Sequence, residues 1–297
     1  MVSHIKPIVK HSLIKLWPEA WEALNIIRGR KSKTTISENP PKFTFQGWGM
    51  TTTTTNPPWV KGQDSIAQSF LQIHNEIIER IQNQSFIQSE STLYKDISGQ
   101  IHLFNELMWR HYLVCWSIIY ASQMTKVKQI NIAECGVCDG VTAFFVMKVL
   151  QKYNYSFKCY LYDSWEAMKS DYLVESELSK TGWYSDASIT RTKQNLKDFD
   201  GFTIFNQGFI PDSLETSTSP ENLVWLHIDL NSSIPTRIAL EFFFDKMPSG
   251  SVILLDDYAW ADFQDTRDVV DAFFKNRAGL FLHFPTGQGI FLKDTSI

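Results

Sequence analysis

From residue 129 onward, short hydrophobic runs alternate with longer segments in which hydrophobic residues recur every three or four positions. The short runs predict strands, and the recurring spacing predicts helices. The expected strands are residues 129–134, 158–163, 202–206, 223–229, 251–257, 280–284 and 289–293. The expected helices are residues 141–152, 188–199, 235–247 and 266–277. This alternation predicts an α/β fold with a mostly parallel sheet covered by helices on both faces, closed by a C-terminal hairpin.

The first hundred residues have a different pattern. Hydrophobic residues recur at helical spacing in residues 64–81, which predicts a helix there. Residues 101–124 predict a long helix that is hydrophobic on most faces. Such a helix is buried in the core or at a dimer interface. The run TTTTTNPPW at residues 51–59 favours extended backbone, as a linker or as a mobile lid. We therefore expect a mainly helical N-terminal extension in residues 1–100, serving as a lid or in oligomerisation, and an α/β domain in residues 101–297.

Composition and charge narrow the function classes. The chain has 297 residues, of which 43% are hydrophobic, enough for a substantial core. A net charge of -4 gives no electrostatic reason to expect a nucleic-acid or membrane partner. The N-terminus lacks the pattern of a signal peptide, and the apolar stretch 107–121 is too short to span a bilayer. We expect a soluble, cytoplasmic protein.

Four cysteines include a CxxC pair, Cys135 and Cys138. A structural zinc site needs a second pair of ligands at suitable spacing, which the chain does not offer. Two interpretations of this pair remain: a redox-active dithiol that follows a strand, or small side chains in a turn.

Ligands of open α/β sheets bind beyond the carboxyl ends of the strands. The first strand ends in the glycine-rich turn Glu134-Cys-Gly136-Val-Cys-Asp-Gly140, and the second ends at Asp163. An acid there can accept hydrogen bonds from ribose hydroxyls, although it can also cap a helix. Together the two features favour a nucleoside-bearing cofactor, and the absence of GxGxxG argues against an NAD-dependent oxidoreductase.

Three more acids follow neighbouring strands: Asp229 after the fourth, and Asp256 and Asp257 after the fifth. If they converge, they need a cation, and carboxylate oxygens favour Mg²⁺ or a similar divalent ion. The alternative is that Asp256 caps a helix while Asp257 is solvated. His227 lies on the same face of its strand as Asp229, where it either contacts substrate or is a hydrogen-bonded core residue.

Six segments carry a resemblance to a known family: AECGVCDG, LYDSWEAM, LHIDLNSSIPTRIALEFF, SGSVILLDDY, ELMWRHYLVCWSI and NQGFIPDSL. Taken in their order along the chain, they resemble class I S-adenosylmethionine-dependent methyltransferases, specifically the macrocin O-methyltransferase family. That family methylates sugar hydroxyls of macrolide and aminocoumarin antibiotics. The resemblance covers residues 106–293.

The resemblance implies a Rossmann-like fold with a seven-stranded sheet, whose last strand is antiparallel. It implies an O-methyltransferase with S-adenosylmethionine and Mg²⁺, acting on a hydroxyl of a small-molecule acceptor, and a possible homo-oligomer. The residues that would contact the cofactor are Glu134, Gly136, Gly140, Asp163, Ser164, Gly208 and Phe209. Asp229, Asp256 and Asp257 would bind the metal, and Asp229 or a nearby side chain, with His227 a candidate, would accept the proton.

One segment departs from the family pattern. The family commonly reads Asp-Gly-Asp-Leu-Tyr where this chain reads Asp229-Leu-Asn-Ser-Ser233. The change lowers the negative charge and removes a ring beside the expected site. It also motivates an alternative function, a methyltransferase-like binding or assembly module without turnover.

Overall fold

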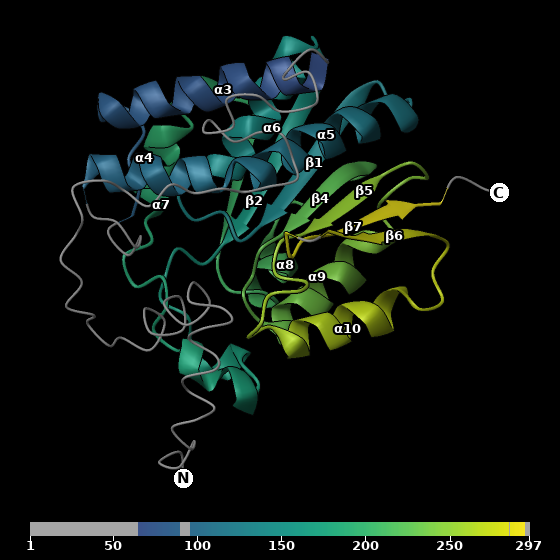
Figure 1. Cartoon of the computed structure of the whole chain (residues 1–297). Coiled ribbons are helices and arrows are strands. Elements are labelled where there is room, and N and C mark those ends of the chain that lie inside the picture. Colours follow the sequence, from purple (N-terminus) through teal and green to yellow (C-terminus); the bar gives the residue numbers. More distant parts are fainter. Residues whose placement is uncertain (1–64, 90–95, 285, 295–297) are drawn as a thin grey trace, which may run out of the picture. The chain divides into compact units, whose positions relative to one another are not determined.

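The computed structural model describes residues 65–89, 96–284 and 286–294, which all belong to one compact unit, Thr44–Ile297. The TTTTTNPPW segment lies outside the described residues. A seven-stranded sheet forms the centre of this unit, in the order β3-β2-β1-β4-β5-β7-β6 (Figure 1). Its strands are β1 (Gln129–Cys135), β2 (Ser156–Asp163), β3 (Thr203–Gln207), β4 (Leu223–Ile228), β5 (Val252–Leu255), β6 (Gly279–His283) and β7 (Gly289–Lys293).

Strands β1 to β5 run parallel, while β7 is antiparallel to both β5 and β6. The predicted parallel sheet and C-terminal hairpin are thus confirmed. The chain moves outward from β1 to β2 and β3, and then returns to the other side of β1 to form β4. The order of strands therefore reverses between β1 and β4, which is where open α/β sheets form their ligand crevice.

Helices cover both faces of the sheet (Figure 1). The helices are α3 (Ser65–Gln82), α4 (Ile97–Glu106), α5 (Met108–Met124), α6 (Val141–Lys152), α7 (Ile189–Asn195), α8 (Asp212–Thr216), α9 (Ser233–Phe244) and α10 (Gln264–Phe274). The 3-10 turns are η1 (Ser170–Tyr172), η2 (Glu175–Lys180) and η3 (Lys197–Phe199). Helices α3, α5 and α6 lie on one face, and α9 and α10 lie on the other.

The central strands are mostly hydrophobic because both of their faces are covered. In β5, Val252 and Leu254 join the core beneath α3, α5 and α6, whereas Ile253 and Leu255 join the core beneath α9 and α10. Successive strand residues point to opposite faces, so a strand between two helical layers has no polar face.

The predicted helix 101–124 is two helices. Asp96 caps α4 by accepting a hydrogen bond from the backbone N–H of Gly99, so the helical segment begins before residue 101. Leu107, at φ -89° and ψ 11°, separates α4 from α5. Hydrophobic periodicity continues across this bend, which is why the sequence pattern did not reveal it. The predicted helix 188–199 likewise ends at Asn195 and continues as η3.

Helix α3 packs into the same core as α5 and α6. Phe70 of α3 stacks on Phe145 of α6 with ring centroids 5.9 Å apart. The described part of the first hundred residues thus completes one helical layer. The expected division at residue 100 stays a prediction.

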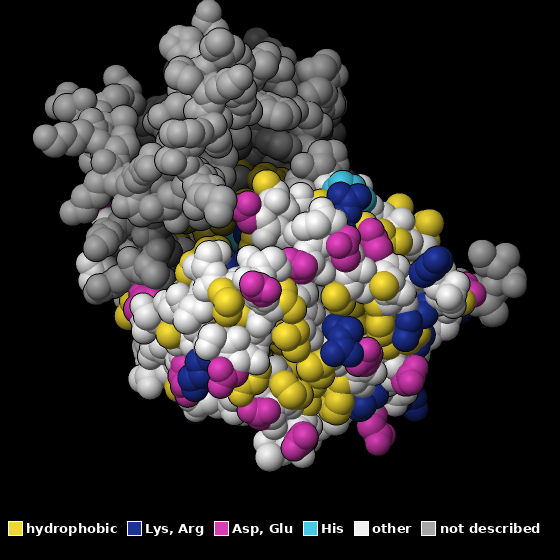
Figure 2. Space-filling model, turned by 90° about the horizontal axis from the view of Figure 1, so that it is seen from below, with side chains coloured by type: hydrophobic (Ala, Val, Ile, Leu, Met, Phe, Trp, Pro, Cys, Tyr) yellow, Lys and Arg dark blue, Asp and Glu magenta, His cyan; other side chains and the backbone are white. Residues whose placement is uncertain are grey.

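No helix in the described residues is long and apolar enough to cross a membrane. On the face shown in Figure 2, acidic and basic side chains are interspersed among hydrophobic ones over the described surface.

Candidate functional site

The glycine turn after β1 joins the ends of three strands. Gly136 has φ +85°, and its N–H donates to the carbonyl of Tyr162 over 2.9 Å. The N–H of Asp229 donates to the carbonyl of Cys135 over 2.8 Å. A Cβ on Gly136 would overlap the carbonyl oxygen of Asp229. Gly140, also at φ +85°, precedes α6. The turn therefore lies directly against the loop that carries Asp229.

Asp163 ties the glycine turn to the end of β2. Its Oδ2 accepts hydrogen bonds from the N–H groups of Val137 and Cys138, over 2.7 and 2.8 Å. Its Oδ1 accepts from the N–H of Trp165 over 2.7 Å. No helix begins at Asp163, so the helix-cap alternative does not apply. A carboxylate has about four acceptor sites, and one on Oδ1 is left for a ribose hydroxyl.

A pocket opens beyond these strand ends. The structure brings most of the predicted site residues to its lining: Gly136, Asp163, Ser164, Gly208, Phe209 and Asp229. Glu134 lies deeper, 3% exposed, and Gly140 supports the turn as the residue that precedes α6.

An aromatic pair forms one wall of this pocket. Phe209 stacks on Tyr172 with ring centroids 4.6 Å apart and planes at 9°. The Tyr172 hydroxyl lies 2.6 Å from an oxygen of Asp212, and the ammonium of Lys169 lies 4.4 Å from the centre of the Phe209 ring. Flat ring faces at this position suit the stacking of a base or another planar group.

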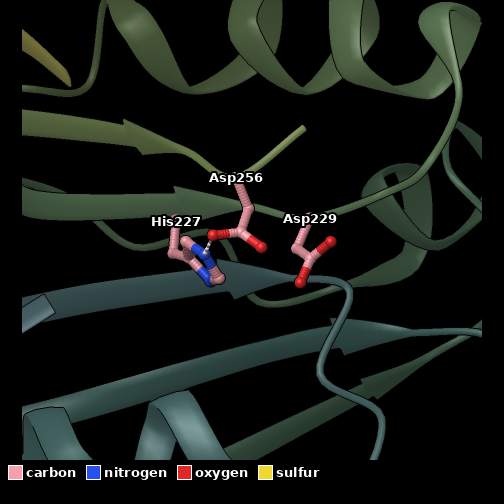
Figure 3. A group of neighbouring side chains, drawn as sticks. All are labelled: His227, Asp229 and Asp256. Carbon is pink, nitrogen blue, oxygen red and sulfur yellow. Dashed lines mark ion pairs between the residues drawn. The ribbon is translucent and has the colours of Figure 1, made fainter. Parts of the chain in front are cut away.

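The acidic residues after β4 and β5 meet in space (Figure 3). Asp229, Asp256 and His227 each offer a ligand atom within 4.8 Å of the others. Asp257 turns toward the next loop, where its Oδ2 accepts from the N–H of Asn231 over 2.8 Å. Burial and the charge of Asp229 raise the pKa of Asp257. No helix begins at Asp256, and Asp257 is 9% exposed, so the alternative of a helix cap beside a solvated acid does not apply.

Arg110 of α5 already supplies a positive charge to this cluster. Its Nη2 forms an ion pair with Oδ2 of Asp256 and lies 3.5 Å from Oδ2 of Asp229. Its Nε donates to Oδ1 of Asp256 over 3.1 Å. Gln288, fully buried, donates to the same Oδ1 over 2.5 Å.

His227 lies beneath the strand ends, between two acids. Its Nδ1 is 3.2 Å from Oε1 of Glu134, and its Nε2 is 4.0 Å from Oδ1 of Asp256. Burial lowers the pKa of His227 to about 4, despite the opposing charge of Asp229. Burial, with the charges of Asp229 and Asp163, raises the pKa of Glu134 well above its usual range. This is the environment of a hydrogen-bonded core histidine, and a catalytic role for His227 stays a prediction.

The donor set fits a divalent cation. Two carboxylates supply the oxygen ligands that Mg²⁺ and Mn²⁺ prefer, whereas an imidazole nitrogen suits transition metals. Asp229 and Asp256 would hold the ion, and a nitrogen of His227 lies within 4.8 Å of their ligand atoms. Binding must also accommodate Arg110, which pairs with both carboxylates.

The departure at residues 229–233 has a structural explanation. The N–H and hydroxyl of Ser233 donate to the carboxylate of Glu177, over 2.9 and 3.1 Å. The carbonyl of Asn231 accepts from the ammonium of Lys180 over 2.8 Å. Glu177 and Lys180 are 2% and 3% exposed. This loop thus docks η2 mainly through backbone atoms, and the Ser233 hydroxyl adds one side-chain hydrogen bond.

The CxxC pair belongs to the turn. All four cysteines are free, and burial raises the pKa of both Cys135 and Cys138 well above the usual range. A reactive dithiol needs a lowered pKa, so the structure favours the alternative of small side chains in a turn.

Sequence reasoning did not identify Arg110, Gln288, Tyr172, Glu177 or Lys180. Arg110 offered a signal, because a cation in a hydrophobic helix needs an anionic partner once it is buried. The others lie in segments without clear periodicity.

Comparisons with known proteins found one matching family model and several similar structures. The family model for macrocin-O-methyltransferase (TylF) matches residues 120–281. The fold is similar to that of the O-methyltransferase NovP, with a TM-score of 0.60, 15% identity, and coverage of 76% of this chain and 100% of that one. It is also similar to CalS11, a calicheamicin methyltransferase, with a TM-score of 0.54, 12% identity, and coverage of 75% and 91%. A search of curated proteins gave no match.

Proposed function

We propose that this chain, which belongs to the macrocin-O-methyltransferase family, methylates a hydroxyl group of a small-molecule acceptor, a sugar or another natural-product moiety. Membership makes it an S-adenosylmethionine-dependent methyltransferase; the acceptor and the participation of Mg²⁺ are the proposal. The observation that carries it is a single pocket lined by Gly136 and Asp163 on the cofactor side and by Asp229 on the other.

The chain's residues suit transfer to an oxygen. In this reaction the acceptor oxygen forms a bond to the sulfonium methyl carbon, the carbon–sulfur bond breaks, and sulfur keeps the electron pair. The acceptor hydroxyl loses its proton, and Asp229, one of the carboxylates that line the pocket, can accept it. Asp163 and the glycine turn would hold the donor in line with the acceptor, and such positioning supplies much of the catalysis.

A divalent cation at Asp229 and Asp256 would orient the acceptor and lower the pKa of its hydroxyl. The alternative, a binding or assembly module without turnover, is suggested by the altered segment 229–233 and by the large N-terminal region. The hydroxyl of Ser233, which donates to Glu177, gives that residue of the segment a role in docking η2 beside the pocket.

Labelled S-adenosylmethionine and a panel of sugars and polyhydroxylated metabolites test the proposal. We expect methyl transfer to a hydroxyl that stops with EDTA and returns with added Mg²⁺. Transfer that EDTA leaves unchanged would remove the metal from the proposal. Cofactor binding without transfer to any hydroxyl would contradict the proposed acceptor class.

Calorimetry tests the cofactor side. We expect Asp163→Ala to weaken binding of S-adenosylhomocysteine by roughly tenfold or more, because a hydrogen bond to a charged group is lost and the turn loses its support. Asp171→Ala, an exposed acid in η1, is the matched control and should bind as the wild type does. Equal affinity in the two variants would place the ribose elsewhere.

A further inference from the structure

One nitrogen of Arg110 bridges the two carboxylates that would hold the metal. The same Nη2 pairs with Oδ2 of Asp256 and lies 3.5 Å from Oδ2 of Asp229. A cation shared by these two acids would need the same position between their Oδ2 atoms. The guanidinium and a divalent ion therefore compete for one place.

Arg110 itself supplies a positive charge beside these two carboxylates. Asp256 is 1% exposed, and an unpaired buried carboxylate is strongly unfavourable. Arg110 removes that cost without any metal. We propose that Arg110 is the resident cation of the apo site, and that a divalent ion binds by displacing its guanidinium from Asp256.

The surroundings allow the exchange. Gln288 donates to Oδ1 of Asp256 and would keep the carboxylate in place after Arg110 leaves, so that Oδ2 becomes free. Arg110 is partly exposed, with 22% of its side chain accessible, and does not have to cross the core to move.

A second position for the guanidinium lies next to the first. Its Cζ is 6.0 Å from the centre of the Trp109 ring and 5.9 Å from that of Trp260. Trp260 is 44% exposed and lies four residues after Asp256 on the same loop. Aromatic faces attract a guanidinium, so the displaced side chain has a favourable site at the edge of the pocket.

The inference deepens the proposed function, on which it rests, by setting the metal affinity of that site. Binding of Mn²⁺ to the full-length protein, followed by the electron paramagnetic resonance signal of the free ion, tests it without any turnover. We expect Arg110→Ala to lower the Kd for Mn²⁺ by roughly tenfold or more, because the competing cation is gone. Arg237→Ala is the control, because it removes an exposed arginine paired with Glu241 on α9 and should leave the Kd unchanged.

Arg110→Lys covers the case in which the alanine variant does not fold. A lysine keeps the charge but not the forked hydrogen bonds, so the Kd should fall by a smaller factor. Thermal unfolding gives a second readout. Without metal, Arg110→Ala should melt below the wild type, and Mn²⁺ should raise its melting temperature by more than that of the wild type.

The Mn²⁺ measurements distinguish the proposed exchange at Arg110 from the proposed metal site itself. A Kd for Mn²⁺ in the Arg110 variants that equals or exceeds the wild-type value would overturn the exchange and leave the proposed metal site intact. No Mn²⁺ binding in any variant would overturn both the exchange and the metal part of the proposed function.

Discussion

At position 136 the backbone leaves no room for a side chain. Gly136 combines a positive φ with a close approach to the carbonyl of Asp229. The first feature strains any other residue, and the second makes an added Cβ overlap backbone atoms that are held by strand pairing. The turn and the loop of Asp229 are therefore fixed relative to each other.

Gly182 makes it possible to separate these two effects. It has φ +88°, but a Cβ there would meet nothing within 4 Å. We expect Gly182→Ala to lower the free energy of unfolding by about 1–2 kcal/mol, the cost of the backbone conformation alone. Gly136→Ala should cost about 3 kcal/mol or more, because the overlap adds to that strain. Urea unfolding measures both, and equal costs would show that the turn can move away from Asp229.

The partner of Arg110 cannot be found from the sequence around it. Its 146-residue separation from Asp256 means that no local pattern links them. Along α5 the local sequence shows only a charged residue among hydrophobic ones, and its partner is found only where α5 packs over β4 and β5.

At the scale of elements, the segment between β2 and α7 builds one side of the pocket. It contributes Tyr172 to the aromatic wall and is anchored by the buried pair Glu177 and Lys180. Lys180 also lies over the ring of Phe263, 3.8 Å from its centre, just before α10. One short 3-10 turn, η2, thus joins the pocket wall to the loops after β4 and β5.

This anchor depends on Ser233, so its loss should loosen the pocket wall. We expect Ser233→Ala to lower the free energy of unfolding by about 1–2 kcal/mol, because Glu177 loses a hydroxyl donor while buried. Hydrogen exchange should become faster in residues 170–180 and stay unchanged in β1. Ser170→Ala, at an exposed position of η1, is the control. Unchanged exchange in Ser233→Ala would show that the backbone N–H bond to Glu177 is sufficient.

At the scale of the whole described unit, one helical layer encloses two histidines. His74 of α3 and His111 of α5 are 2% and 6% exposed and stack on Phe104, with centroids 4.5 and 4.9 Å apart. Burial lowers the pKa of His74, against a hydrogen bond to Asn105. Burial, followed by the charges of His74, Arg110 and His227, lowers the pKa of His111 well below its usual range.

We expect these two buried histidines to make the stability of the fold depend on pH. In the folded protein they stay neutral below the ordinary imidazole pKa of about 6.5, whereas the unfolded chain binds protons there. The contribution of these two histidines to the free energy of unfolding should therefore fall as the pH decreases below about 6.5. The double variant His74→Gln, His111→Phe should show a shallower fall in urea unfolding between about pH 7 and pH 5. His283→Gln, on the exposed side of β6, should keep the wild-type slope, and an equally steep fall in the double variant would contradict the assignment.

The sequence by itself determined the order and type of the strands, the glycine turn and the acids that follow β2, β4 and β5. These features are local, because strand alternation, helical spacing and turn glycines depend on neighbours a few residues away. The resemblance of the same segments to a methyltransferase family was confirmed by the family match.

Only the tertiary structure decided which groups share the site. It separated α4 from α5 at Leu107, turned Asp257 toward Asn231, and placed Arg110 and Gln288 on Asp256. These contacts join residues that are far apart in the chain, and they depend on how helices and strands pack rather than on the periodicity of any one segment. The acids could thus be named from the sequence, whereas the cation beside them could be found only in the folded chain.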